Sequence, residues 1–214
     1  MLLYILGGNP IGDMGISKIL NAIFKAGSAK KLLRLELKKC NIVFATESMS
    51  TLAKCSNLRA LDLSDNCITL DIKSSRSTAT DVFSELTLLE SFSLSNNKIK
   101  DDGLNAIYST LIKMQNLKVL ALANTFITGK SASIIGRFIK ASPIMNSNSV
   151  ELADSPWHEY YRPDGFPSLY HLMLQGHLIP HEIVADLKYT NQHREIKVEY
   201  TGTLTSIEYP LRYG

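Results

Sequence analysis

The sequence lacks any apolar run close to the roughly 18 residues that a membrane-spanning helix needs, so we expect no membrane segment. Residues 1–8 are apolar but have no basic segment and no small-residue cleavage site, which argues against a secretory signal. The sequence contains only three cysteines, Cys40, Cys55 and Cys67, and no CxxC pair. This odd number predicts neither a disulfide framework nor a zinc site. We therefore expect reduced thiols and a cytoplasmic location.

Strong charge of either sign is also missing. The formal net charge is +3, and the basic residues are scattered except for a cluster at 30–39 that includes Glu36. Proteins that bind nucleic acid concentrate Lys and Arg on one face, so we expect no nucleic-acid partner. With 45% hydrophobic and 20% charged residues, the chain is predicted to fold.

The common catalytic and nucleotide-binding motifs are absent: the sequence has no GxGxxG, GxxxxGK[ST], HExxH or GxSxG. The nearest dense group of titratable residues is His171, His177 and His181. We expect the first two side chains to diverge, one onto the sheet surface and one inward, whereas metal ligands must converge. The sequence thus predicts no cofactor, no metal site and no enzymatic activity.

What the sequence does contain is an internal repeat of the form L-x-x-L-x-L-x-x-N-x-I. It reads LLRLELKKCNI at 32–42, LRALDLSDNCI at 58–68, LESFSLSNNKI at 89–99, LKVLALANTFI at 117–127 and LYHLMLQGHLI at 169–179. The asparagine slot, here called the anchor, falls at 9, 40, 66, 97, 125, 155, 177 and 201. The units that end at 155 and 201 are degenerate. About eight repeats are therefore predicted.

The pattern has a direct structural meaning. Period-2 alternation places the leucines inside and the intervening residues outside on a short strand. We expect parallel strands at 3–6, 34–37, 60–63, 91–94, 119–122 and 171–174. The anchor side chain should turn inward and bind backbone groups at the bend. Apolar residues at helical spacing predict helices over 16–24, 104–112 and 134–139.

Two segments, NPIGDMG at 9–15 and NKIKDDG at 97–103, carry a family resemblance. The chain resembles the ribonuclease-inhibitor-like subfamily of leucine-rich repeats, which includes the Ran GTPase-activating protein and sensor regions of nucleotide-binding innate immune receptors. The resemblance implies an α/β fold: a curved solenoid with parallel strands on its concave face and helices on its convex face. It also implies a single domain over residues 1–214 that binds another protein.

The repeat is interrupted at several places. The polar stretch 71–81 is expected to be a surface loop, residues 142–168 an irregular insertion, and residues 190–214 a segment that closes the C-terminal end. The first strand begins almost at Met1 without a polar cap, although solenoids generally need capped ends. The chain is therefore either a fragment of a longer protein or is covered at that end by another segment.

Alignment of the units places outward residues in rows across the sheet. The predicted central row contains Ile5, Glu36, Asp62, Ser93, Ala121, Glu151, Met173 and Lys197. It forms a trough of Ser and Ala with charged strands on both sides. We expect a partner to contact Arg34, Glu36, Lys38, Asp62, Asp65, Ser93, Glu151, Asp154, His171 and Met173.

The insertion adds Trp157, Tyr160 and Tyr161, which are aromatic residue types that dominate binding hot spots. Two interpretations remain open: the rings contact the partner, or they replace a missing helix as buried core. For the whole chain we favour an adaptor, sensor or inhibitor that binds a protein partner on its concave face. The alternatives are a GTPase activator or another enzyme-regulatory protein, and a purely structural solenoid segment.

Overall fold

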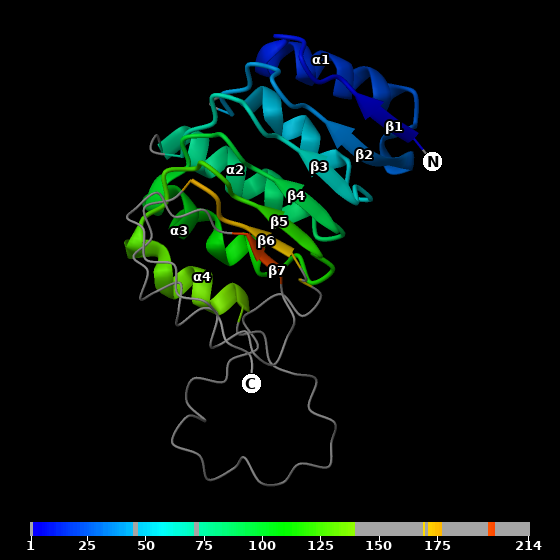
Figure 1. The fold of residues 1–214 in the computed structure, drawn as a ribbon. Coiled ribbons are helices and arrows are strands. Elements are labelled where there is room, and N and C mark those ends of the chain that lie inside the picture. The colour runs from blue at the N-terminus through cyan, green and yellow to red at the C-terminus, as the bar shows by residue number, and fades with distance from the viewer. Residues whose placement is uncertain are drawn as a thin grey trace, which may run out of the picture.

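One parallel sheet runs through the protein. The structure, a computed structural model, describes residues 2–44, 47–70, 73–139, 169, 171–176 and 197–199. Seven strands pair in parallel in chain order (Figure 1). They are β1 (Leu2–Ile5), β2 (Leu32–Glu36), β3 (Ala60–Asp62), β4 (Ser91–Ser93), β5 (Val119–Ala121), β6 (His171–Met173) and β7 (Lys197–Glu199). The six strands expected from the leucine pattern are confirmed, to within one or two residues at their ends.

The register of the sheet also follows the repeat. Leu61 on β3 pairs with Leu35 on β2 and with Phe92 on β4, and all three side chains are buried. The outward residues form a row of their own, in which the partners are Ile5, Glu36, Asp62, Ser93, Ala121 and Met173. The assignment of alternate residues to an inward and an outward face is therefore confirmed for β1 to β6, although the outward residues of β1 and β5 are apolar.

Two predicted members of the central row are wrong. Strand β5 pairs directly with β6, so no strand around Glu151 lies between Ala121 and Met173. Met173 pairs with Glu199, while Lys197 pairs with His171, so the last strand is shifted by two residues. Such a shift keeps every side chain on the same face, so the apolar alternation cannot detect it. The prediction at 151 rested on an alternation of only two apolar residues, which is too short to define a strand.

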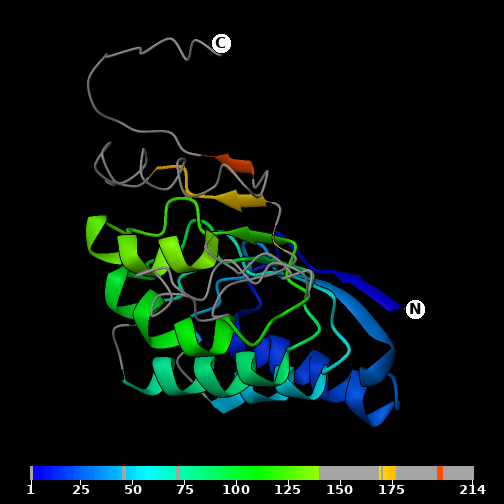
Figure 2. The same ribbon diagram turned by 90° about the horizontal axis from the view of Figure 1, so that it is seen from below.

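A layer of helices covers the other face of the sheet (Figures 1 and 2). It contains the α-helices α1 (Gly12–Lys25), α2 (Lys73–Glu85), α3 (Lys100–Leu111) and α4 (Ala132–Ile139), and the 3₁₀ helices η1 (Ala29–Lys31), η2 (Glu47–Lys54) and η3 (Gly129–Ser131). The three predicted helices correspond to α1, α3 and α4. Parallel strands on one face and helices on the other make this a leucine-rich-repeat solenoid.

The surface loop expected at 71–81 is wrong, because helix α2 begins at Lys73. Ala79, Val82 and Phe83 are buried and follow the i, i+3, i+4 spacing of a helix face. The Phe83 ring lies 5.4 Å from that of Phe44 and 5.0 Å from that of Phe92. These three residues dock the helix on the core, whereas the polar composition of the segment suggested only a solvated loop.

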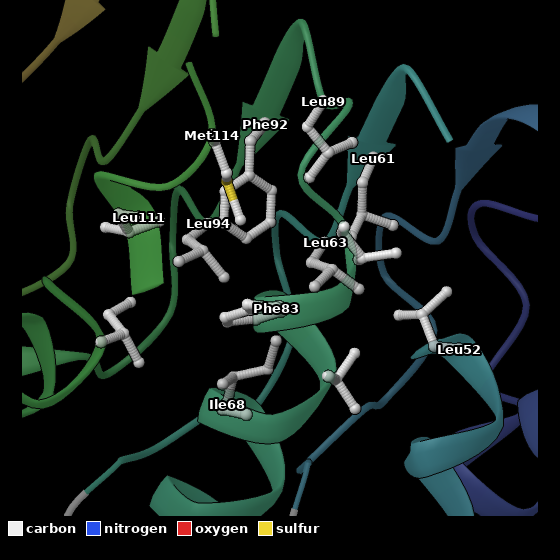
Figure 3. Packing of buried hydrophobic residues seen from close by; sticks show 14 of the residues in the cluster. Leu52, Leu61, Leu63, Ile68, Phe83, Leu89, Phe92, Leu94, Leu111 and Met114 are labelled. Carbon is white, nitrogen blue, oxygen red and sulfur yellow. The ribbon is translucent and has the colours of Figure 1, made fainter. Parts of the chain in front are cut away.

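The core lies between the two layers. Leu61, Leu63 and Phe92 extend from the strand side toward Phe83 of the helix layer and Leu52 of η2 (Figure 3). No single repeat could bury such a face alone, so each repeat depends on its neighbours for stability.

The anchor residues tie each repeat to the one before it. The Asn66 Oδ1 accepts hydrogen bonds from the backbone N–H of Cys40 (2.9 Å) and Ile42 (3.0 Å) in the preceding repeat. Its Nδ2 donates to the carbonyls of Leu37 (2.8 Å) and Leu63 (2.9 Å), on both sides of the junction. The inward anchor predicted from the sequence is confirmed here.

The same slot is filled by Asn97 with an equivalent set of hydrogen bonds, and by Cys40 and Thr125 with fewer. Asn97 repeats the arrangement: it accepts from the Ile68 N–H at 3.0 Å and donates to the carbonyl oxygens of Leu63 and Leu94, both at 2.9 Å. The Cys40 thiol donates to the Leu6 carbonyl (3.3 Å), and the Thr125 hydroxyl donates to the Leu122 carbonyl (2.7 Å).

The D-x-G part of the two quoted motifs also has an inter-repeat role. Asp101 accepts hydrogen bonds from the next repeat: from the Thr128 N–H (2.9 Å), the Thr128 hydroxyl (2.7 Å) and the Ser131 hydroxyl (2.6 Å). Asp13 accepts from the Val43 N–H at 2.9 Å in the same way. A Cβ at Gly103 would lie 2.9 Å from the Leu70 Cβ, so glycine permits the close approach of α3.

Leu94 and Ser93 provide a test of the inward and outward assignment. Leu94 is fully buried beside the Asn97 bend, so Leu94→Ala should lower the free energy of unfolding by about 2–5 kcal/mol through lost burial and a cavity. Ser93→Ala, on the half-exposed outward row, should change it by less than about 0.5 kcal/mol. Urea unfolding followed by circular dichroism measures both. Equal losses would contradict the assignment.

Asp101 predicts a pH-dependent contribution to stability. Burial raises the pKa of its carboxyl, but hydrogen bonds from Ser131 and Thr128 and the charge of Lys130 together outweigh burial and lower it below the ordinary value. Because the folded-state pKa lies below the unfolded value of about 3.9, the contribution is complete above that pH. It is lost as pH falls through the folded-state pKa.

We therefore expect Asp101→Asn to lower the free energy of unfolding by about 1–3 kcal/mol at pH 7. The difference in this free energy between the variant and the wild type should become smaller below about pH 4. Thermal unfolding between pH 3 and pH 7 measures this gap. Asp102→Asn, at the exposed neighbouring position, is the control. A gap that stays constant over this range would show that the carboxylate is not the group responsible.

Candidate functional site

The outward side chains of β1 to β6 lie on the face of the sheet opposite the helices, which we call the concave face (Figures 1 and 2). In the central row, Glu36, Asp62, Ser93 and Met173 are partly exposed, whereas Ala121 is almost fully buried. None of the four partly exposed side chains belongs to the hydrophobic core. The strand alternation thus leaves these side chains available for contact with another molecule.

Charge on this face is concentrated on β2, β3 and the bends that follow them. The Arg34 guanidinium lies 2.6 Å from the Glu36 carboxylate on the same strand, and the Lys38 ammonium lies 3.2 Å from Asp65. The Asp62 carboxylate accepts a hydrogen bond from the Ser64 N–H at 2.8 Å. These carboxylates are thus oriented by near neighbours rather than free to rotate.

A shallow hollow of about 100 Å³ lies across β2, β3 and β4, lined among others by Arg34, Glu36, Asp62 and Ser93. Four predicted partner-binding residues therefore meet at one place. Beyond this hollow the face is made of small side chains on β4 and β5, followed by His171 and Met173 on β6. At the β2–β3 end the predicted charges flank the trough. On the other side, the register places Lys197 and Glu199 of β7 next to His171 and Met173, so the charged strand expected there is β7 and not a strand around Glu151.

An apolar patch beside these charged residues was not among the predicted site residues. Leu3 and Ile5 on β1 occupy the same rows as Arg34 and Glu36, and they are 47% and 62% exposed. Large apolar side chains at outward strand positions were the available signal. The patch lies on β1, next to the charged residues of β2.

Several predicted site residues lie outside the described part of the chain: Glu151, Asp154, Trp157, Tyr160 and Tyr161, and the two histidines His177 and His181. Their predicted roles stay predictions. Across the residues that the structure does describe, no group of three or more His, Cys, Asp or Glu side chains is arranged to hold a metal ion. In the same residues, no helix has the length and hydropathy to cross a membrane.

A second polar feature, here called the asparagine ladder, follows the edge where the strands end. The Asn124 Nδ2 donates to the Asn96 Oδ1 (2.8 Å), and the Asn96 Nδ2 donates to the Asp65 carboxylate (2.9 Å), which Lys38 neutralises. The residue before the anchor has a positive φ in six repeats; these residues are Gly8, Lys39, Asp65, Asn96, Asn124 and Gly176. Gly, Asn and Asp tolerate this conformation best, and their recurrence before the anchor could have revealed the ladder.

At the opposite edge, where the strands begin, charges form a chain across three repeats. Glu90 lies 2.9 Å from Arg59 and 2.7 Å from Lys118. The hydrogen bond from Lys118 outweighs the effect of burial and, together with Arg59, lowers the pKa of the Glu90 carboxyl. This network is largely exposed, so it contributes little to stability but fixes the charge pattern of that edge.

The three cysteines differ sharply in their surroundings. Cys40 and Cys55 are buried, whereas Cys67 is exposed beside the asparagine ladder, and all three are free thiols. Burial raises the pKa of Cys55 to about 11 and also raises the pKa of Cys40. Only Cys67 is therefore placed to react with a reagent in solution.

Comparison with known proteins supports the repeat. A family model described as "Leucine Rich repeat" matches residues 54–72 and 85–107, the two units with the anchors Asn66 and Asn97. The comparison with curated proteins found no match. Among solved structures, the chain is similar to an internalin (inlF) from Listeria monocytogenes, with 18% identity and a TM-score of 0.48. The alignment covers 88% of this chain and 38% of the internalin chain.

The thiols give a prediction that tests this local structure. N-ethylmaleimide should alkylate Cys67 at least about 100-fold faster than Cys55 at pH 7.5, because only a thiolate reacts and Cys55 is both buried and shifted to high pKa. Intact mass spectrometry should show one adduct on the native protein and three in denaturant. A native protein that takes up two adducts at similar rates would contradict the burial of Cys40 and Cys55.

Proposed function

We propose that this protein binds another protein on its concave face and acts on that partner as an adaptor, a sensor or an inhibitor. The observation that carries the proposal is the register of exposed rows on β1 to β6, whose side chains face away from the core. Leucine-rich repeats generally mediate protein–protein interactions. The rows offer a partner a surface that the hydrogen-bonded sheet holds in place.

The composition of the surface favours a particular mode of contact. The apolar pair Leu3 and Ile5 offers area to bury, while the charged groups on β2 and β3 set orientation and register. The small side chains of β4 and β5 allow a loop or helix of the partner to approach the sheet closely. If the covered surface included the partner's active site, substrate could no longer reach it, and the partner would be inhibited.

We also assign the chain to the ribonuclease-inhibitor-like subfamily, as a non-enzymatic module of the cytoplasm. The D-x-G segments lie in the first turns of α1 and α3, where Asp13 and Asp101 stand, and this arrangement supports the subfamily. The Cys40 thiol supports a reducing compartment, because it fills an anchor slot as a hydrogen-bond donor to Leu6. In this proposal Glu151, Asp154 and the aromatic residues Trp157, Tyr160 and Tyr161 extend the binding surface.

Charge reversal on the sheet tests the function. Glu36→Lys combined with Asp62→Lys should weaken partner binding at least about tenfold, since both acids line the hollow across β2 to β4. The partner is first captured on the tagged wild-type protein and identified by mass spectrometry. Its affinity for each variant is then measured by surface plasmon resonance.

The matched control is Asp81→Lys combined with Glu85→Lys, which makes the same charge change at exposed positions of α2 on the helical face. Melting temperatures should stay close to wild type for both double variants, because exposed ion pairs add little stability. A partner that tolerates the sheet variant but not the helix variant would move the binding site to the convex face.

A further inference from the structure

A groove of about 450 Å³ lies along the edge where the strands end, outside the concave rows. It crosses three repeats and is lined by Asn66, Cys67, Thr69, Asn96, Asn97, Lys98, Asn124 and Phe126. One wall is formed by Asn96 and Asn124 of the asparagine ladder. The other is formed by the residues that follow the anchors. The anchors Asn66 and Asn97 lie buried at the floor.

Phe126 is the first unusual feature of this groove. Its side chain is 61% exposed, and its backbone has a φ of 61°. A bulky residue is unfavourable in that left-handed region, where the equivalent residue of the second repeat is Asn41, with a φ of 57°. The exposed ring is therefore available to pack against a ligand that lies in the groove.

Lys98 is the second feature. Its side chain is exposed on the same wall, one repeat before Phe126, and no carboxylate pairs with it within the part of the chain that the structure describes. Lys38 and Lys118, by contrast, pair with the carboxylates of Asp65 and Glu90. The groove therefore carries a positive charge that a ligand carboxylate would complement.

The opposite wall supplies hydrogen-bond donors. The ladder uses one N–H of the Asn96 side chain and one of Asn124. A side-chain amide has two such hydrogens, so each asparagine keeps one N–H that can reach a carbonyl group in the groove. These two N–H groups can donate to backbone carbonyls of a peptide that lies in the groove.

We propose that this groove binds an extended peptide segment that carries a carboxylate and, two residues further on, an aromatic side chain. Lys98 and Phe126 come from adjacent repeats, which lie about 5 Å apart in a sheet, and their long side chains can span the difference from the spacing of about 6.5 Å between side chains two residues apart in an extended peptide. The carboxylate pairs with Lys98 and the ring packs on Phe126. The ladder amides bind the peptide carbonyls. This site is independent of the binding function proposed for the concave face.

The test uses the full chain and the peptide acetyl-Gly-Glu-Gly-Phe-Gly-amide, titrated to millimolar concentration and followed by ¹H–¹⁵N NMR. We expect saturable shifts of the Asn96, Lys98 and Phe126 backbone amides. The peptide should also slow the alkylation of Cys67, which lines the groove and is the exposed thiol. Two further peptides, with Lys in place of Glu and Ala in place of Phe, should bind at least about fivefold more weakly.

Two variants locate the site. Phe126→Asn places at this left-handed position the residue type found at Asn41, so the fold should be kept or made more stable while the ring is lost. Lys98→Met keeps most of the stem and removes the charge. Each should weaken peptide binding at least about fivefold. The controls are Phe24→Ala and Lys113→Met, at exposed positions away from the groove.

Several results would overturn the proposal. One is the absence of shifts or of Cys67 protection, and another is equal binding of the three peptides. Unchanged affinity of a folded Phe126→Asn protein would do the same. A concentration-dependent dimer that Phe126→Asn abolishes would show that a second copy occupies the groove. Because Glu36 and Asp62 lie outside the groove, the charge-reversed sheet variant should bind the peptide normally, which separates failure here from failure of the concave-face proposal.

Discussion

Hydrogen bonding of the buried bend after each strand is the constraint on which the rest of this structure depends. In the repeats that contain β2 to β5, the backbone turns away from the sheet at buried anchors, where water does not reach, and unpaired buried amides are costly. Asn66 and Asn97 solve this problem by accepting from one repeat and donating to the carbonyls of two. Their side chains set the spacing and the register of the strands.

Because the anchors hold these bends from within, the residues directly before and after each described anchor take no part in the core. The outward strand positions collect into the concave rows, and the positions around the anchors collect into the asparagine ladder and the groove beside it. Two distinct surfaces therefore arise from one repeated unit. A change of side chain in either surface has little effect on the core, since the leucines and Phe83 carry the packing.

Interactions between neighbouring repeats carry the stability, and they are asymmetric along the chain. Asp13 and Asp101 each reach forward to the next repeat, whereas the anchors reach backward. The Asn9 side chain is exposed, and its Nδ2 donates to the nearby carbonyls of Leu6 and Gly7.

The sequence by itself determined the fold class, the six strands, three helices and the inward role of the anchors, because alternation, helical spacing and the L-x-x-N pattern are local signals. It also placed Arg34, Glu36, Asp62 and Ser93 on one face. Only the tertiary structure decided that β5 meets β6 and how β7 is aligned, since pairing between distant residues leaves no trace in alternation. The position of α2 also came only from the tertiary structure, because its sequence is mostly polar and its buried face is short. The same holds for the groove in which Lys98, Phe126 and the asparagine ladder lie together. Three repeats contribute two or three residues each to that groove, so no single repeat contains the pattern that would have revealed it.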